Sequence, residues 1–390
     1  MKRNTLKTVT GRIIPLIMAL LFITTPAFAA TEEYNPMFTC KSAIDSWRNK
    51  KEILHTKYEG KVSDEVFNPE AEFTLENTQV VRKEKGKDFV ILNLTDIHFS
   101  DYDYRFFYGF NAEATARRLV KEVKPDLITV TGDAVCDSST YMAIRRFTDL
   151  MESFGVPWAP VFGNHDDEGN CDLNYLCDVM MSAPHCLLKK GDPAMGYGNY
   201  VVTIVEENDG APAICEALVM MDSHHSQPNE VQQNWLKWVG EGINRISSNN
   251  ADISVWMHIP LPEYQYAKDE FYNTRKHSWA PECSGHGEIH EKICCERDAD
   301  SNPVQRGFYE ASKSVGTIKN IICGHEHMNN FSVMYDGIRI TYTLKLGFSS
   351  GFQPGFNGGT VITVTDKGLT HMTYKTAKFR SFKVIEDFDI

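Results

Sequence analysis

From residue 89 onward, the chain repeats a short apolar run, a polar cluster and then usually a helical stretch. Almost continuous apolar runs rich in Val and Ile are typical of strands that are buried on both faces of a sheet. The helical stretches between them then serve as crossover connections. The runs cover residues 89–94, 127–131, 158–162, 217–221, 253–257 and 318–323. This rhythm predicts an α/β fold.

Helical periodicity and a change of pattern near the C-terminus complete the predicted architecture. Residues 139–154 and 230–246 place large apolar side chains at helical spacing, so each helix should bury one face. Residues 338–346, 360–365 and 371–375 are alternating or β-rich and are separated by glycine-rich turns, which favours antiparallel strands. We therefore expect a four-layer αββα sandwich, in which two mixed β-sheets are flanked by helices.

Five of the six apolar runs end in residue types that bind metal ions. In α/β folds, ligands gather at the carboxyl ends of the strands. One Asp-x-His or His-x-His cluster alone is weak evidence, but an ordered series at five strand ends indicates a single site. The clusters are Asp96-Ile97-His98, Gly132-Asp133, Gly163-Asn164-His165-Asp166, His258 and Gly324-His325-Glu326-His327.

The order of these clusters resembles that of the calcineurin-like metallophosphoesterase family, over about residues 89–365. The resemblance implies two metal ions bridged by Asp133. It also implies that His165 stabilises the phosphoryl group or protonates the leaving oxygen, and that Asp166 orients the His165 ring. The implied ligands of the first metal are Asp96, His98 and His327, and those of the second are Asn164, His258 and His325.

The donor types suit Zn, Mn or Fe, because carboxylates and neutral imidazoles bind such borderline metals. Two of these cations lower the pKa of a bridging water and neutralise charge on a phosphoryl group. Residues 163–168 and 258–264 are similar to a branch of the family related to the purple acid phosphatases. Those enzymes carry an iron-binding tyrosine three residues after the bridging aspartate, where this chain has Cys136. We therefore expect a Zn, Mn or Fe/Zn pair rather than a purple iron centre.

Residues 1–29 have the features of a secretory signal peptide, cleaved near Ala29. Four basic residues precede an apolar run at 13–24, which is shorter than the ~20 residues that span a bilayer. Removing this leader changes the formal charge from −12 to −16, which disfavours binding to a nucleic-acid duplex. We expect a secreted or periplasmic protein with no transmembrane segment, an N-terminal extension at 30–87 and a catalytic domain at 88–390.

All ten cysteines follow the predicted leader, so export would place them where disulfides form. Cys171 and Cys177 are close enough in sequence to pair, and so are Cys283 and either Cys294 or Cys295, although the sequence does not fix the connectivity.

The long stretch 260–302 is expected to form a crosslinked loop beside the site. Cys283, His286, His290, Cys294 and Cys295 have a spacing that would suit an extra zinc ion, but disulfides with solvated histidines are favoured. The aromatic residues of this stretch, such as Tyr264 and Trp279, either line a substrate rim or form a small satellite core.

Taken together, the sequence predicts an acid-phosphatase-like enzyme that hydrolyses small phosphate monoesters. A phosphodiesterase of the same fold, acting on nucleotides or sphingomyelin-type lipids, is the nearest alternative, because both reactions use the same two-metal centre. A non-catalytic binding protein is a further alternative, which the intact Asp133, Asn164 and His165 disfavour. A zinc peptidase is not expected, since the sequence has no His-Glu-x-x-His motif.

Overall fold

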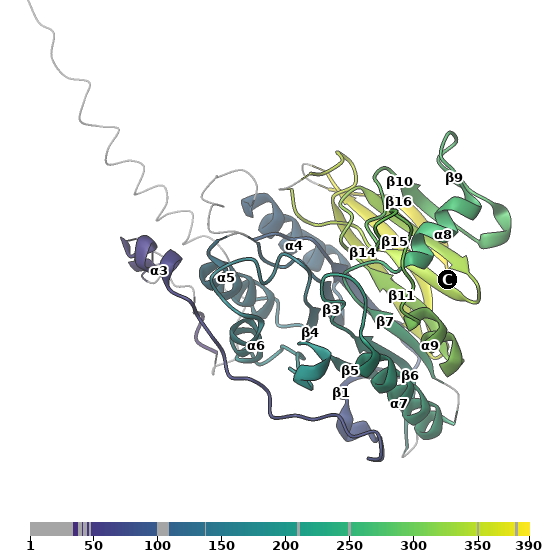
Figure 1. The fold of residues 1–390 in the computed structure, drawn as a ribbon, viewed down its shortest axis with the longest axis horizontal. Helices are drawn as coiled ribbons and strands as arrows, with labels where there is room; N and C mark the ends of the chain where they lie inside the picture. Colours follow the sequence, from purple (N-terminus) through teal and green to yellow (C-terminus); the bar gives the residue numbers. More distant parts are fainter. Residues whose placement is uncertain are drawn as a thin grey trace, which may run out of the picture.

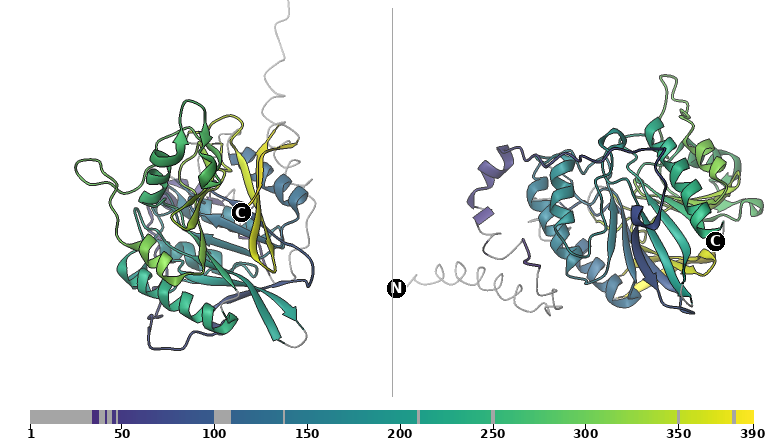
Figure 2. Two further views of the ribbon diagram at one scale, coloured as in Figure 1. Left: turned by 90° about the vertical axis from the view of Figure 1, so that its right-hand side faces the viewer. Right: turned by 90° about the horizontal axis from the view of Figure 1, so that it is seen from below.

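Two large mixed β-sheets pack face to face, with helices on their outer sides (Figure 1, Figure 2). This arrangement confirms the predicted α/β sandwich. The computed structural model describes residues 34–37, 41, 45–46, 48–99, 109–136, 138–208, 211–248, 251–348, 351–378 and 381–390. The predicted leader at 1–29 lies outside these residues.

The first sheet has six strands in the order β16-β15-β14-β2-β3-β4, and its β2, β3 and β4 are parallel. Helix α4 packs on β2 and β14, while α5 packs beside α6. The strands are β2 (Phe89–Leu94), β3 (Leu127–Thr131), β4 (Trp158–Val161), β14 (Gly358–Thr365), β15 (Gly368–Ala377) and β16 (Phe382–Asp389). The helices are α4 (Gly109–Val123), α5 (Thr140–Glu152) and α6 (Leu173–Met181).

The second sheet has eight strands in the order β1-β5-β6-β7-β11-β13-β12-β10, and its outer side carries the remaining long helices. Helix α7 packs on β6, and α9 packs on β11. The strands are β1 (Gln79–Lys83), β5 (Tyr200–Asn208), β6 (Ala211–Met220), β7 (Asp252–Trp256), β10 (His286–Ile289), β11 (Ile318–Cys323), β12 (Asn329–Tyr335) and β13 (Ile338–Tyr342). The helices are α7 (Glu230–Ser247), α8 (Pro262–Phe271) and α9 (Phe308–Val315).

The central strands bury both faces, as their apolar runs predict. Along β6, Leu218 and Met220 face the core between the two sheets, whereas Ala217 and Val219 face the core under the outer helices. This division follows from the two-residue period of a strand. The predicted strands at 89–94, 127–131 and 318–323 coincide with β2, β3 and β11, and the other three overlap β4, β6 and β7.

The N-terminal extension contributes to the second sheet as well as covering its surface. After α3 (Lys50–His55) and the short helix η1 (Leu75–Asn77), strand β1 pairs in parallel with β5 at the sheet edge. The buried side chain of Phe73 lies against α7, where a Cβ on Gly242 would come within 2.4 Å of it. The extension is therefore packed into the folded domain through strand β1 and Phe73.

The stretch 260–302 contains regular structure, so the prediction of a long loop is wrong. It holds α8, β10, the short helix η4 (Pro281–Cys283) and a small hairpin of β8 (Tyr272–Asn273) and β9 (Ser278–Trp279). Tyr264 is fully buried, and its hydroxyl donates to the Ile321 carbonyl oxygen at 2.8 Å. The ring of Trp279 lies 4.9 Å from that of Phe331. These two aromatic side chains therefore belong to a core and not to a substrate rim.

The described cysteines other than Cys136 carry free thiols, and Cys40 lies outside the described residues. The predicted pairings of Cys171 with Cys177 and of Cys283 with a later cysteine are absent from this part of the chain. Cys177 is fully buried in the core, whereas Cys171 donates to the side chain of Asn170 and Cys283 donates to the Ala280 carbonyl oxygen. Cys171 and Cys283 therefore each donate to a different local acceptor and do not pair with another described cysteine.

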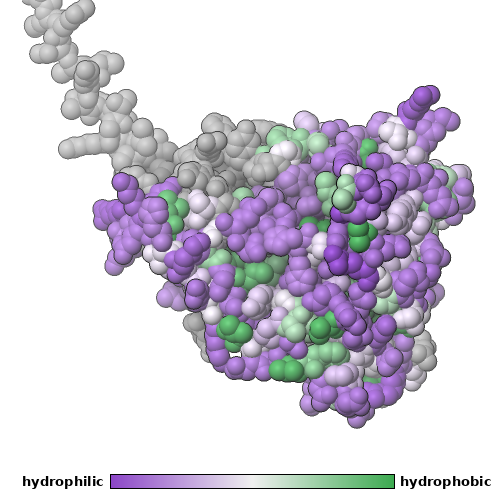
Figure 3. Space-filling view, in the orientation of Figure 1, coloured by the Kyte–Doolittle hydropathy of each residue, from purple (hydrophilic) through white to green (hydrophobic). Residues whose placement is uncertain are grey.

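The surface is mainly hydrophilic on the face in Figure 3, where apolar side chains form small, separate patches. The exposed large apolar residues belong to different elements; Val62 and Val66 lie in the extension, Phe352 in the loop before β14 and Val384 in β16. None of the helices in the described ranges combines the length and apolar character that a membrane span requires.

Glu216 in β6 is a buried carboxyl group whose titration should affect stability. Burial, with a smaller contribution from nearby Asp252, raises the pKa of Glu216 to about 8, although nearby Ser254 opposes this shift. At pH values between the ordinary pKa of a glutamate and about 8, Glu216 keeps its proton in the folded chain but has lost it in the unfolded chain. The free energy of unfolding should therefore fall as the pH rises through this window.

We predict that Glu216→Gln removes this pH dependence. The stability of the variant relative to the unmodified protein should increase between pH 5 and 8, by at most about 1.4 kcal/mol per pH unit. Urea unfolding of both proteins at several pH values provides the measurement. Two parallel stability profiles across this range would contradict the prediction.

Candidate metal centre

The five polar clusters of the sequence converge at the carboxyl ends of strands from both sheets. The clusters follow β2, β3 and β4 of the first sheet and β7 and β11 of the second. Two groups of potential ligands result, each with its ligand atoms within 4.8 Å of one another. They are Asp96, His98 and His327, and Asp133, His258 and His325.

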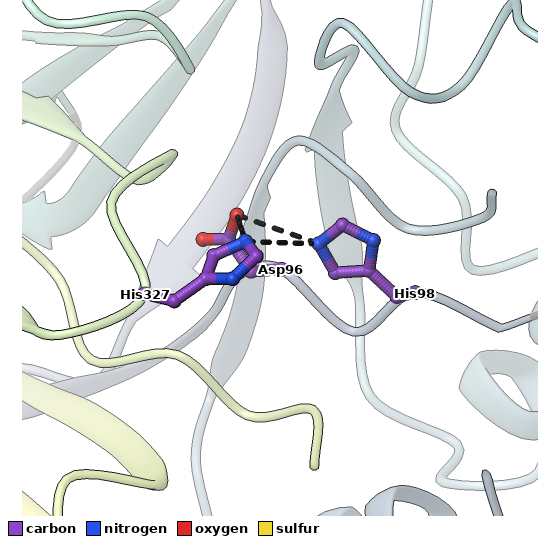
Figure 4. A group of neighbouring side chains, drawn as sticks. All are labelled: Asp96, His98 and His327. Carbon is purple, nitrogen blue, oxygen red and sulfur yellow. Dashed lines mark hydrogen bonds and ion pairs between the residues drawn. The ribbon is translucent and has the colours of Figure 1, made fainter. Parts of the chain in front are cut away.

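The first group joins the loop after β2 to the loop after β11 (Figure 4). The Nε2 atoms of His98 and His327 are 3.2 Å apart. Asp96 Oδ1 lies 3.4 Å from His327 Nε2 and 3.8 Å from His98 Nε2. Two nitrogens and one oxygen thus face a common point, which fits a borderline metal ion.

The second group surrounds Asp133, which follows β3. Asp133 Oδ2 lies 3.2 Å from His258 Nε2, and His258 Nε2 lies 3.3 Å from His325 Nδ1. The same oxygen is 3.7 Å from His98 Nε2 in the first group. Asp133 therefore stands between the two groups, which is compatible with a carboxylate that bridges two ions.

Three buried oxygens in this region support the same assignment. Among the described residues, Asp96 Oδ1, Asp133 Oδ2 and Asn164 Oδ1 have no hydrogen-bond partner. Most buried polar atoms are satisfied. Other unpaired atoms are scattered through the described residues, but these three belong to residues that follow β2, β3 and β4, which favours a shared partner. All three belong to predicted metal ligands and are hard or borderline donors. The donor set therefore fits a dinuclear metal site.

Backbone carbonyl groups fix the orientation of two imidazoles. His258 Nδ1 donates to the Thr131 carbonyl oxygen at 2.7 Å, and His327 Nδ1 donates to the Gly351 carbonyl oxygen at 3.0 Å. With Nδ1 donating to a carbonyl oxygen, Nε2 is the nitrogen of each ring that a cation would occupy, and at His258 the cation would displace the proton that Asp133 stabilises there. This arrangement is common in histidines that bind metals, since the outer partner sets the tautomer.

The backbone of the site is held in an unusual conformation. Asp96, His98, Asp133 and His325 all have positive φ, between 51° and 80°. Non-glycine residues rarely adopt this region, and such strain is concentrated at functional sites. The loops also need a glycine at 163, because a Cβ there would lie 2.2 Å from Asp133 Oδ1.

Burial and neighbouring charges set the protonation of the ligands. Burial lowers the pKa of both His98 and His325 to about 4, so these rings are neutral near pH 7 and ready to bind a cation. Although burial alone would raise it, the His327 and His98 rings hold the pKa of Asp96 well below its usual range. Burial likewise opposes protonation of His258, but the Asp133 carboxylate outweighs it and raises the pKa of His258 to about 10.

His165 lies at the open side of the centre, with its Nε2 4.0 Å from Asp133 Oδ2. Its side chain is 35% exposed, compared with 1% or less for Asp96, His98 and His258. This exposure sets His165 apart from the buried ligands. A group that meets a substrate from solvent would occupy such a position.

Asp166 does not contact the His165 ring as the sequence suggested. Its two carboxylate oxygens instead accept hydrogen bonds from the backbone N–H groups of Asp133, Val135 and Gly163, at 2.7–3.1 Å. The carboxylate partner of His165 Nδ1 is Glu168, at 2.8 Å. The turn after Gly163 directs Asp166 toward the backbone, so Asp166 shapes the loop and Glu168 orients the ring.

Lys345 is a buried neighbour of the centre that no sequence motif indicates. Its Nζ donates to the Asp96 carbonyl oxygen at 3.0 Å, and burial lowers the pKa of this amine to about 8. Cys136, at the position where a tyrosine was expected, donates its thiol to the His98 carbonyl oxygen at 3.6 Å. Both residues support the backbone that carries the first group.

Comparisons with known proteins identify the family. Residues 89–329 match the model of the calcineurin-like phosphoesterase family. The match covers more than half of the chain, and the protein belongs to this family.

Several relatives carry names from the purple acid phosphatase group. A protein of Arabidopsis thaliana named probable inactive purple acid phosphatase 14 is 25% identical over 69% of this chain and 73% of its own length. Probable inactive purple acid phosphatase 28 of the same plant is 24% identical over 77% of this chain and 81% of its own length. Among solved structures, the purple acid phosphatase PPD1 of yellow lupin has a TM-score of 0.47 at 12% identity, covering 78% of this chain and 54% of that one.

We predict that Asp133→Asn and His258→Ala each lower the metal content of the folded protein. The first removes the carboxylate charge between the two groups, and the second removes a nitrogen donor. Elemental analysis of the purified proteins, with circular dichroism as a test of folding, provides the measurement. His371→Ala is a suitable control, because His371 pairs with Asp387 and Asp389 on β16. Unchanged metal content in both site variants would contradict the assignment.

Proposed function

We propose that this chain is an exported phosphoesterase that hydrolyses small phosphate monoesters at a dinuclear metal centre. The observation that carries this proposal is the set of three buried oxygens without hydrogen-bond partners, on Asp96, Asp133 and Asn164, beside four imidazoles in the described part of the chain. When bound, two cations would supply hydroxide near neutral pH and neutralise negative charge on the phosphoryl group. Zn, Mn and Fe all suit these donors.

In this proposal, His165 is the catalytic residue contributed directly by the chain. Its Nδ1 is paired with Glu168, so its Nε2 faces the centre and can hold the proton that the leaving oxygen needs. The part-exposed position of His165 lets it meet a substrate while the buried ligands remain covered. Glu168 acts as a positioning residue, because it contacts the ring and not the reacting atoms.

Export follows from the signal-peptide features of residues 1–29. The partner would be a small phosphorylated molecule outside the cytoplasm. The strongly acidic composition after leader removal disfavours a nucleic-acid duplex as the partner.

The word "inactive" in the names of the two Arabidopsis relatives favours a second candidate, a non-catalytic protein that keeps the fold for binding. Phosphatase DCR2 of Saccharomyces cerevisiae, 24% identical over 65% of this chain and 46% of its own length, is named as an enzyme. The presence of Asp133, Asn164 and His165 supports catalysis here. A phosphodiesterase with the same ligands is the third possibility.

A substrate comparison separates these three candidates. We predict that the protein loaded with Zn, Mn or Fe hydrolyses p-nitrophenyl phosphate faster than bis-p-nitrophenyl phosphate, and that Asp133→Asn abolishes both reactions. Faster cleavage of the diester would instead support the phosphodiesterase. A metal-loaded protein with no turnover of either compound would support the binding protein.

We also predict that Glu168→Gln lowers kcat by about tenfold, the scale of effect seen when an orienting partner is lost. The metal content and KM should stay unchanged, since the Glu168 carboxylate pairs with the His165 ring and not with a predicted metal ligand among the described residues. The loss should be larger for an alkyl phosphate than for p-nitrophenyl phosphate, because a poor leaving group depends more on a proton donor.

The neighbouring substitution Asp167→Asn is the matched control, since Asp167 faces His225 at 3.5 Å and not His165. Equal losses for both leaving groups in Glu168→Gln, or the same loss in Asp167→Asn, would contradict the positioning role.

A further inference from the structure

A second set of imidazole and carboxylate side chains gathers away from the metal centre, at the β8–β9 hairpin and β10. His277 lies in the hairpin turn, Glu288 lies in β10, and His290 follows β10 directly. One nitrogen from each imidazole and one carboxylate oxygen lie within 4.8 Å of one another. Figure 1 shows β9 beside α8 at one end of the molecule.

The three side chains already contact one another. Glu288 Oε2 is 2.7 Å from His290 Nε2, and the rings of His277 and His290 stack with centroids 5.2 Å apart. The hydroxyl of Tyr272 lies 3.3 Å from His277 Nδ1 and also accepts the Ile289 N–H. Two imidazoles and one carboxylate form the donor set that zinc uses when solvent fills the remaining position.

The backbone and the exposure of the cluster are suited to binding an ion from solvent. His277 has a φ of 46°, a conformation that costs a non-glycine residue of order 1 kcal/mol or more and that the surrounding contacts must hold. The side chain of His290 is 17% exposed and that of Glu288 is 45% exposed. The cluster is thus reachable from solvent, but its histidines are held by the hairpin and by β10.

We propose that His277, Glu288 and His290 form a third metal site, which binds a borderline divalent cation such as Zn²⁺. The site differs from the cysteine- and histidine-rich set that the sequence suggested. Of that set only His290 takes part, because Cys283 donates to a backbone carbonyl oxygen and His286 stacks on Phe388 at 4.1 Å. A bound cation would join the β8–β9 hairpin to β10.

This metal-mediated connection would stabilise the segment that contains His327. The backbone N–H groups of His290 and Glu291 donate to Asn329 Oδ1 at 2.9 and 3.1 Å, and the Glu291 carboxylate accepts the Met328 N–H. Met328 and Asn329 directly follow His327. A cation held at β10 therefore stabilises the strand that positions a predicted ligand of the main centre, without contacting a substrate.

The first test counts zinc bound to the full-length protein. Metal-free protein is dialysed against zinc buffered at about 1 µM free ion, a concentration that selects for sites of at least micromolar affinity. His277→Ala and His290→Ala should each bind one equivalent less than the unmodified protein. His286→Ala, the matched control on the same strand, should bind the same amount as the unmodified protein. Unchanged zinc content in both cluster variants would overturn the proposal.

The second test separates this site from the main centre. In the Asp133→Asn background, zinc should still raise the melting temperature by mass action, because the third site remains. Adding His277→Ala should reduce that rise, because one of the remaining zinc sites is lost. A rise of the same size in the double variant, or no rise in Asp133→Asn alone, would overturn the proposal. Both readouts are independent of phosphoesterase activity, so failure of the proposed function would leave their outcome unchanged.

Discussion

The burial of two carboxylates among imidazoles is the constraint on which the rest of the site depends. Asp96 and Asp133 are fully buried, and each leaves one oxygen without a hydrogen-bond partner among the described residues. A buried charge is costly unless it is paired or binds a metal. Because His98 and His325 are neutral near pH 7, they offer lone pairs rather than positive charge. Bound cations would therefore balance the buried negative charge of Asp96 and Asp133 and pair with their free oxygens.

The two-sheet architecture makes this arrangement possible. Asp96 and Asp133 follow adjacent parallel strands of one sheet, whereas His258 and His325 follow adjacent strands of the other. Packing the sheets face to face brings the four strand ends together. The strained φ angles of Asp96 and Asp133 turn their side chains inward, and the large buried cores under both sheets hold that strain. The stability of the sandwich and the geometry of the centre are thus linked.

The sequence predicts the central strands and the ligand clusters well, because buried parallel strands are continuous apolar runs with ligands at their ends. It fails where the backbone path of a loop decides which side chains meet. Asp166 is next to His165 in sequence, yet the turn after Gly163 directs Asp166 to the backbone and brings Glu168 to the ring. Short strands such as β8, β9 and β10 carry too few residues for a period to be recognised.

The central claim is that Asp133 stands between two metal ions held by strand ends of both sheets. Anomalous diffraction from crystals of the protein soaked in Mn²⁺ or Zn²⁺ tests it most directly. The account predicts two peaks on opposite sides of Asp133, one beside Asp96, His98 and His327 and the other beside Asn164, His258 and His325. A single peak, or none between these residues, would contradict it.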